Sequence, residues 1–488
     1  MAGAVLAVAL CAPAGALASS NPLLSGWTSN STNLAGATAV AISGHYAYAL
    51  GYYPGQLAAI DISNPAHPSV AGASGVANSL IDGTTVNVSG GYAYVVSKNR
   101  NASAHDNDDG TGNSLTILDV HTNPAVPAIV GSVRDPSQLF GGYGVAVSGG
   151  YAYVAGQGIL AGQPAAPDSG TGSFAVVNVS DPAHPTIVAH LDNDVLPSPW
   201  TGSGALQHVC SVFVAGHYAY VTAAYSDRLT VIDIANPSAP AIVASNNQLA
   251  FPVDVAVEGH YAYVANQTEN LLHPNFQVVN VANPASPRVV GQLVDPAVLK
   301  GAYRVRVHGR FAYLASVDTA TVAAVNISNP AHPVLAGRVT SPAHLTATTG
   351  LDVDAAGRYV VATSFFQPSQ TEPGYPPYPP APGAPLNTGT VSTIKLDPAR
   401  IAVKLARSSE PPSVATRTSG SFRFSVSDAI ATVQCKLDRS RFGACTGSSS
   451  QRYRSLKQGK HTFVVQAADA AGKTATARYR WTVRRKGK

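Results

Sequence analysis

One motif recurs from one end of this chain to the other, and its repetition limits the folds that the chain can adopt. The clearest copy spans residues 216–243 and reads GHYAYVTAAYSDRLTVIDIANPSAPAIV. Seven copies are spaced by 43 to 67 residues, judged from their first aromatic residue: Tyr46, Tyr92, Tyr151, Tyr218, Tyr261, Phe311 and Tyr359. Self-similarity at this period is typical of propeller blades and solenoids.

Each copy predicts four short strands. The first has valine at alternate positions, such as Val86 and Val88, and a glycine-containing turn joins it to a Tyr-x-Tyr-Val strand. The third strand is apolar on both faces and ends in Asp or Asn, so we expect neighbouring blades to cover it on both sides. An Asx-Pro turn follows, as at Asn236-Pro237, and a second proline then opens an outer strand.

Four strands per copy and seven copies predict an all-β, seven-bladed β-propeller over residues 19–400. The Tyr-x-Tyr-Val strand, the apolar strand ending in Asp and the Asn-Pro turn resemble the repeat of the LVIVD-repeat proteins. The resemblance covers about residues 36–398 and implies a secreted or cell-surface propeller. It implies no particular activity, because few members of that family have an assigned one. The seventh copy departs most, since Lys395 replaces the acidic residue.

The N-terminus carries two expectations. Residues 2–18 are apolar and end in Ala16-Leu17-Ala18, which predicts a signal peptide over residues 1–18 that is cut after Ala18. Leu10 precedes Cys11 where a lipoprotein signal has a small residue, which argues against lipidation. Residues 22–28 resemble a fourth strand without its first three, so we expect them to complete the last blade; the alternative is a disordered leader.

The net charge of +5 divides unevenly along the chain. Up to Val403 there are 13 basic and 22 acidic residues, whereas from Lys404 onward there are 18 basic and 4 acidic ones. Residues 404–488 therefore form a separate basic domain. Its alternating strands and motifs such as Trp481-Thr482-Val483 resemble bacterial Ig-like modules. The resemblance implies a small β-sandwich that links, spaces or adheres, with a disulfide between Cys435 and Cys445.

The insertions of the repeat gather on one predicted face of the propeller, which we call the loop face. It carries the connections between second and third strands and between blades, whereas the opposite turn face carries the short Gly and Asx-Pro turns. The insertions are residues 98–113, 156–172, 192–209, 266–275, 341–350 and 364–389. Variable loops on a rigid scaffold often bind ligands, so the loop face is the candidate functional surface.

One of these insertions contains Asp106, Asp108 and Asp109 beside glycine. Clustered carboxylates suit calcium, which takes six to eight oxygen ligands, but the spacing differs from an EF-hand loop and no glutamate closes it. The segment is either a solvated turn or a calcium-stabilised loop. Calcium is the one cofactor for which the sequence offers candidate ligands.

Charged residues occur in the innermost strands, which line a propeller channel. Aligned from the glycine turns, the equivalent positions are Ala39, Thr85, Gly144, Ser211, Asp254, Arg304 and Asp352, with Arg306 and Asp354 two residues further on. This alignment places Arg304 between two aspartates. It predicts either an ion-pair network, in which loss of Arg304 costs several kcal/mol, or a polar ligand in the channel.

The sequence favours binding over catalysis. His208 and His344 fall on the loop face, and their convergence with Asp106 would indicate a secreted hydrolase or lyase, which is the alternative function. Cys210 lies in a first strand, where burial favours an inert thiol. We expect an exported binding scaffold for protein or polysaccharide, with the basic domain as a spacer or as an anchor to an anionic envelope polymer. No nucleic-acid recognition motif is present.

Overall fold

The fold comes from a computed structural model. It describes residues 20–98, 110–158, 172–193, 204–268, 272–365, 389–398, 403–406, 411–416, 418–426, 432–447, 449–468 and 474–484. The expected signal peptide and the loop with Asp106, Asp108 and Asp109 lie outside these residues. The chain forms two compact units, one spanning Pro22–Leu396 and the other containing Asp397–Lys488.

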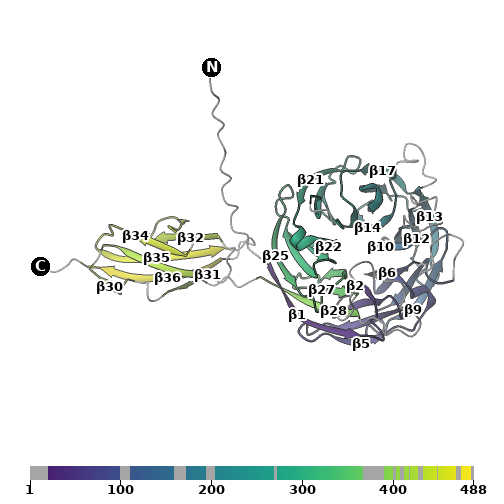
Figure 1. Cartoon of the computed structure of the whole chain (residues 1–488), viewed down its shortest axis with the longest axis horizontal. Coiled ribbons are helices and arrows are strands. Elements are labelled where there is room, and N and C mark those ends of the chain that lie inside the picture. Colours follow the sequence, from purple (N-terminus) through teal and green to yellow (C-terminus); the bar gives the residue numbers. More distant parts are fainter. Residues whose placement is uncertain are drawn as a thin grey trace, which may run out of the picture. The chain divides into compact units, whose positions relative to one another are not determined.

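The first unit is a β-propeller of seven four-stranded antiparallel sheets around a central axis (Figure 1), as predicted. The first three blades are β2 (Ala37–Ser43), β3 (Tyr46–Gly51), β4 (Gln56–Asp61) and β5 (Ser69–Ala73); β6 (Gly83–Ser89), β7 (Tyr92–Ser97), β8 (Ser114–Asp119) and β9 (Ala128–Arg134); and β10 (Gly142–Ser148), β11 (Tyr151–Gly156), β12 (Ser173–Asn178) and β13 (Thr186–Asp192).

The other four blades follow in chain order. They are β14 (Val209–Ala215), β15 (Tyr218–Ala223), β16 (Arg228–Asp233) and β17 (Ala241–Asn246); β18 (Pro252–Glu258), β19 (Tyr261–Asn266), β20 (Phe276–Asn280) and β21 (Arg288–Leu293); β22 (Ala302–His308), β23 (Phe311–Ser316), β24 (Thr321–Asn326) and β25 (Val334–Thr340); and β26 (Thr348–Val353), β27 (Tyr359–Ser364) and β28 (Gly389–Pro398) with β1 (Ser20–Asn30). In the described connections, three short helices occur at Asn78–Leu80, Ala224–Ser226 and Pro296–Leu299 (α1).

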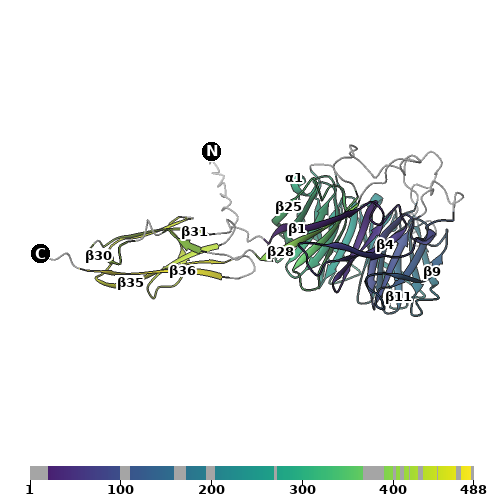
Figure 2. The ribbon, with the colours of Figure 1, turned by 90° about the horizontal axis from the view of Figure 1, so that it is seen from below.

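The ring closes through its two ends, because the N-terminal β1 pairs with β28 as the outer strand of blade seven (Figure 1 and Figure 2). Gly26 in β1 makes the same close approach to the next blade as Gly72 in the fourth strand β5. A Cβ at Gly26 would lie 2.5 Å from the Ala66 carbonyl oxygen of blade one, and a Cβ at Gly72 would meet the Ala125 carbonyl oxygen of blade two. β1 therefore packs as a fourth strand does. The prediction that residues 22–28 complete the last blade is confirmed.

Burial follows the predicted strand order. Third strands such as β8 and β12 are buried along almost their whole length, whereas outer strands such as β9 are largely exposed.

The Asx residues of the repeat stabilise the turn that follows the third strand. At the end of β4 the Asp61 carboxylate accepts a hydrogen bond from the Ser63 amide at 2.8 Å, and Asn64 accepts one from the Ala66 amide at 3.2 Å. These side chains hold the turn in place.

The second unit contains two sheets. One has the order β29 (Val403–Leu405), β31 (Gly420–Val426), β34 (Ser450–Tyr453); the other has the order β30 (Val414–Ala415), β36 (Thr474–Val483), β35 (Gly459–Ala468), β32 (Thr432–Leu437), β33 (Gly443–Ala444). The sheets share a core in which the rings of Phe422 and Phe463 stack with centroids 4.3 Å apart. This is a β-sandwich; the finer assignment as an Ig-like module stays a prediction.

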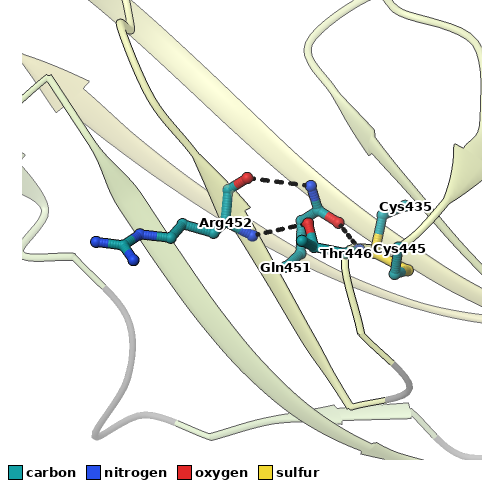
Figure 3. Close-up of a disulfide and its surroundings, with 5 residues drawn as sticks. All are labelled: Cys435, Cys445, Thr446, Gln451 and Arg452. Atoms are coloured by element: carbon teal, nitrogen blue, oxygen red, sulfur yellow. Dashed lines mark hydrogen bonds between the residues drawn. A yellow bond between two sulfur atoms is a disulfide. The ribbon is translucent and has the colours of Figure 1, made fainter.

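A disulfide joins Cys435 and Cys445, as the resemblance implied, with their Cα atoms 5.1 Å apart (Figure 3). The chain beyond Cys445 is fixed by a side-chain amide, since Gln451 accepts a hydrogen bond from the Thr446 amide at 2.7 Å. Searched across its described residues, the chain contains no helix that is long and apolar enough to cross a membrane.

Candidate functional site

The propeller channel holds a cavity of about 250 Å³, lined by the innermost strand of every blade. Each of these strands bulges once, so that one residue is skipped in the pairing with the second strand. The positions that follow the bulge are equivalent in all blades: Ala39, Thr85, Gly144, Ser211, Asp254, Arg304 and Gly350.

Blade seven therefore differs from the sequence alignment, which was wrong to place Asp352 in this set. The turn between β26 and β27 is two residues longer than in the other blades, because Val353 pairs with Val360. An alignment started from the glycine turn is shifted by that difference. Gly350 takes the aligned position, and Asp352 is level with Arg306.

Arg306, not Arg304, is the arginine between the two aspartates. Its guanidinium donates a hydrogen bond to Asp254 at 3.0 Å and lies 3.8 Å from Asp352. Asp254 also accepts hydrogen bonds from the Ser211 hydroxyl at 2.6 Å and from the Val305 amide at 2.9 Å. This network joins blades four, five, six and seven, so the predicted ion-pair network exists with a different arginine at its centre.

Asp352 completes the link to blade one. Its carboxylate accepts hydrogen bonds from the Ile42 amide at 2.7 Å and from the Val353 amide at 2.9 Å. Burial nevertheless raises the pKa of Asp352, although Arg306 and these amides act in the opposite direction. Its surroundings in the channel thus make the charged form of Asp352 less favourable than it is in water.

Asp354 takes no part in this network. It lies in the blade-seven turn, where it accepts hydrogen bonds from the Tyr359 amide at 2.9 Å and from the side chain of Arg358 at 2.9 Å. Its sequence position two residues beyond Asp352 suggested a channel group. The longer turn removes it from the channel.

Arg304 lies two residues nearer the loop face than Arg306 and is differently placed. Its side chain is 6% exposed, and its guanidinium carbon lies 4.9 Å from the ring centroid of Tyr303. Within the part of the chain that the structure describes, this guanidinium has no hydrogen bond and no ion pair. Burial lowers the pKa of Arg304, but nearby Asp254 and two tyrosines outweigh it and raise the pKa overall.

Two tyrosines meet across the loop-face end of the channel. Tyr143 belongs to β10 in blade three and Tyr303 to β22 in blade six, and their hydroxyl groups are hydrogen-bonded to each other. Blades three and six are not neighbours, so the bond crosses the channel. The ammonium of Lys98 lies 5.8 Å from the ring centroid of Tyr143. Burial lowers the pKa of Lys98 although Asp82 acts to raise it.

The same end of the channel contains His208 and Cys210. The His208 ring stacks on Tyr225 at 4.0 Å, and its buried Nδ1 has no hydrogen-bond partner among the described atoms. Burial lowers the pKa of His208 to about 3, so the ring is neutral at physiological pH. Burial also raises the pKa of the Cys210 thiol to about 12, which fits the predicted inert thiol.

We call Lys98, Tyr143, His208, Cys210, Tyr303 and Arg304 the mouth cluster. Sequence reasoning identified His208 and Arg304 but missed Lys98 and both tyrosines. A signal for the tyrosines existed, because Tyr143 and Tyr303 both occupy the bulge position that threonine holds in three other blades. A large side chain at a repeat position that faces the channel is an indication of a site.

The two predicted histidines do not form one site. His344 stacks on Trp27 of β1 with ring centroids 3.9 Å apart, in blade seven, whereas His208 contacts Tyr225 in blade four. Asp106, the third residue of the predicted set, lies outside the described residues. A search of the described residues finds no group of three or more His, Cys, Asp or Glu side chains that could hold a metal ion.

The residues that begin the blades share an unusual backbone conformation at the loop-face end of the channel. The residue that begins each blade at the loop face has φ between +50° and +65°, and its carbonyl accepts the amide that follows the second strand, as Asp82 does from Lys98 at 3.2 Å. These residues are Gly36, Asp82, Gly141, His208, Phe251, Gly301 and Ala347. Four of the seven are not glycine and are strained in this conformation.

Solved structures similar to this chain are distant from it in sequence. They include a functionally unknown protein from Desulfotomaculum acetoxidans (9% identity, 70% of this chain and 97% of that chain, TM-score 0.48) and a protein from Lactobacillus plantarum (15%, 67% and 87%, 0.49). A periplasmic gluconolactonase from Pseudomonas aeruginosa is 17% identical over 64% of this chain and 87% of that chain, with a TM-score of 0.48. A search of curated proteins finds no match.

The family assignment comes from the repeat itself. The model of the LVIVD repeat matches residues 36–74, 82–101, 110–135, 143–161, 169–193, 207–248, 253–295 and 301–341. These segments cover six blades and just over half of the chain, and blades two and three are each matched in two pieces around their insertions. The chain therefore belongs to the LVIVD-repeat family.

Proposed function

We propose that this protein is an exported binding scaffold whose loop face recognises a protein or polysaccharide. Export is supported by the disulfide between Cys435 and Cys445, because such bonds persist in oxidising compartments. The residues 1–18 have the pattern of a signal peptide. The β-sandwich unit acts as a spacer or as an anchor to an anionic envelope polymer.

One observation supports recognition at the loop face most directly. Trp27 of β1 is 51% exposed and stacks on His344, which lies in the connection between blades six and seven. Burial lowers the pKa of His344, so a neutral aromatic pair faces solvent at physiological pH. Exposed tryptophan is enriched among the residues that carry binding energy, because it offers a large apolar surface at low entropic cost.

The basic unit supplies the second contact. On β36, Arg478 and Arg480 are exposed, and on the neighbouring β35 their cross-strand partners are Val464 and Thr462. Lys460 is exposed on the same strand as those partners. Clustered cations with few carboxylates attract polyanions, and salt weakens such binding.

The test measures retention of the full-length protein on acidic polysaccharide, neutral polysaccharide and immobilised extracellular protein. Trp27→Ala should weaken capture at the loop face, while Leu23→Ala, which removes another exposed apolar side chain of the same strand, should not. Arg478→Ser with Arg480→Ser should remove only the salt-sensitive part. Equal capture by all variants, or no capture of any material, would contradict the proposal.

The rival function is a hydrolase or lyase on the loop face. It needs a converging set of catalytic groups, and the described histidines His208 and His344 lie in different blades. Turnover of a glycan or lactone by the purified protein would favour the rival. The binding proposal stands if the same materials are retained unchanged.

A further inference from the structure

We propose that the mouth cluster binds the carboxylate of a small organic anion, held by the guanidinium of Arg304 and the ammonium of Lys98 beside the hydroxyls of Tyr143 and Tyr303. This inference rests on the proposed binding function and adds the ligand class. It places recognition of a small ligand at the loop-face end of the channel, apart from the exposed Trp27.

Arg304 is the first reason. A buried charge is costly unless hydrogen bonds or an opposite charge compensate it. Arg306 is compensated by Asp254 and Asp352, although its side chain is 29% exposed. Arg304 is 6% exposed and has neither kind of partner among the described residues. Asp254 and two tyrosines favour its charge electrostatically, but its five N–H donors have no hydrogen-bond acceptor among the described residues.

Lys98 is the second reason. It follows β7 at the loop-face end of blade two, is half-buried, and forms no ion pair in the described part of the chain. The nearest carboxylate that acts on it is Asp82, which has interactions of its own. Burial outweighs the effect of Asp82 and lowers the pKa of Lys98, so its ammonium lacks a full counter-charge.

The two cations converge on one place. Both act electrostatically to lower the pKa of the Cys210 thiol, although burial raises it overall. Each also flanks one ring of the hydrogen-bonded tyrosine pair, Lys98 at Tyr143 and Arg304 at Tyr303. An anion between them would meet a bidentate donor, an ammonium and two phenol groups, which is a set suited to a carboxylate.

The charge balance favours one negative charge over two. Arg304, Arg306 and Asp254 line the cavity, with Asp352 beside Arg306, while Lys98 at the mouth has Asp82 near it. Three cations thus face three carboxylates, and the set has no excess charge of either sign. A dianion such as phosphate would depart further from this balance than a monoanion and would meet the two channel carboxylates, so a monocarboxylate is the better match.

The channel cavity beside the mouth cluster limits the size of the ligand. Arg304 and Cys210 line this cavity, and its volume of about 250 Å³ is below the roughly 300–1,000 Å³ of pockets for drug-sized molecules. The ligand is therefore a small acid, such as a sugar acid, or the acidic end of a longer glycan. Backbone strain at His208 and Asp82, which both begin blades at this end, is typical of a site under functional constraint.

The experiment uses the full-length protein with sodium acetate and sodium glucuronate as probes, and with glucose, sodium phosphate and sodium chloride at equal ionic strength as controls. A carboxylate should raise Tm saturably, and calorimetry should give its Kd. Arg304→Gln should weaken binding by about tenfold to a hundredfold, and Lys98→Met should weaken it less. Arg288→Gln, which removes an exposed charge from β21, should change nothing.

Several outcomes would overturn the inference. It fails if neither carboxylate shifts Tm beyond the chloride control, if only phosphate does, or if Arg304→Gln binds as tightly as wild type. It also fails if Arg304→Gln is much less stable than wild type, because Arg304 would then have a structural partner. Retention of polysaccharide or protein by Arg304→Gln without carboxylate binding would leave the scaffold function intact and remove only this site.

Discussion

The two faces of the propeller use the same left-handed backbone conformation with different residues. At the turn face, the hairpin between first and second strands has glycine at positive φ in every blade: Gly44, Gly90, Gly149, Gly216, Gly259, Gly309 and Gly357. At the loop face the equivalent conformation falls on glycine in only three blades. The turn face is therefore relaxed throughout, whereas the loop face retains strain in the four blades that have Asp82, His208, Phe251 or Ala347 in place of glycine.

The buried charges show the same division. Arg306, nearer the turn face, lies between two carboxylates that are themselves hydrogen-bonded. Arg304, nearer the loop face, is more deeply buried and has no such partner in the described residues. One end of the channel thus pairs its buried charge with carboxylates, whereas the other end leaves a buried guanidinium without a hydrogen bond in the described residues. That difference is what distinguishes a candidate site from a structural network.

Replacing Arg306 should produce the largest effect. Arg306→Met leaves Asp254 and Asp352 without their cation, and we expect a loss of about 3 kcal/mol in the free energy of unfolding, at the lower end for a buried pair because Arg306 is partly exposed. Denaturant unfolding measures it. Arg304→Met is the matched control and should change stability by less than about 1 kcal/mol, because no carboxylate loses a hydrogen bond. Equal losses in both variants would remove the distinction between the two ends.

The sequence was sufficient to predict the architecture because every blade is built from the same local patterns. Alternating valines, the glycine turn and the Asx-Pro turn each have a local cause, so seven copies predicted seven blades and even the closing strand at residues 22–28. The site was harder to predict. Which arginine meets Asp254 depends on a bulge in β22 and on a turn in blade seven that is two residues longer, and neither changes the motif.

Contacts between distant blades were also beyond the sequence. Tyr143 and Tyr303 are 160 residues apart, and only the closed ring brings their hydroxyls together. Lys98 follows a strand at the start of an insertion, where a lysine is ordinarily solvated. Its burial comes from the blades that surround it, so a pattern of residues in one repeat could not reveal it.

Exchanging glycine and alanine between the two faces should give effects of opposite sign. Gly44→Ala places a Cβ where no atom lies within 4 Å, so its cost is that of the left-handed backbone alone, about 1 kcal/mol. Ala347→Gly removes the same strain at the loop face and should stabilise the protein by up to about 1 kcal/mol. Thermal and denaturant unfolding of both variants measure the pair. A loss of stability in Ala347→Gly would show that the loop face is not strained there.

Asp352 offers a smaller effect with a defined pH dependence. Because burial raises its pKa, the folded state binds more protons than the unfolded state just above pH 3.8, so this group makes stability fall as pH rises through the folded pKa. Asp352→Asn should remove that fall and change stability near pH 7 by less than about 1 kcal/mol. Unfolding of wild type and variant from pH 4 to pH 7 measures the difference. If the variant had the same pH profile as wild type, the titration of Asp352 would not be the cause of the fall in stability.

The smallest effect is expected at Lys98, where the sign is reversed. Burial lowers the pKa of this lysine, so below pH 10.5 the unfolded state binds more protons than the folded state, and this group makes stability rise with pH. Lys98→Met should flatten that rise between the lowered pKa and pH 10.5. The difference between variant and wild type isolates the lysine, because tyrosines such as Tyr143 titrate equally in both. A saturating carboxylate should also flatten the rise in wild type, since a bound anion returns the pKa of Lys98 towards its ordinary value; a rise that persists with the ligand would place the anion away from Lys98.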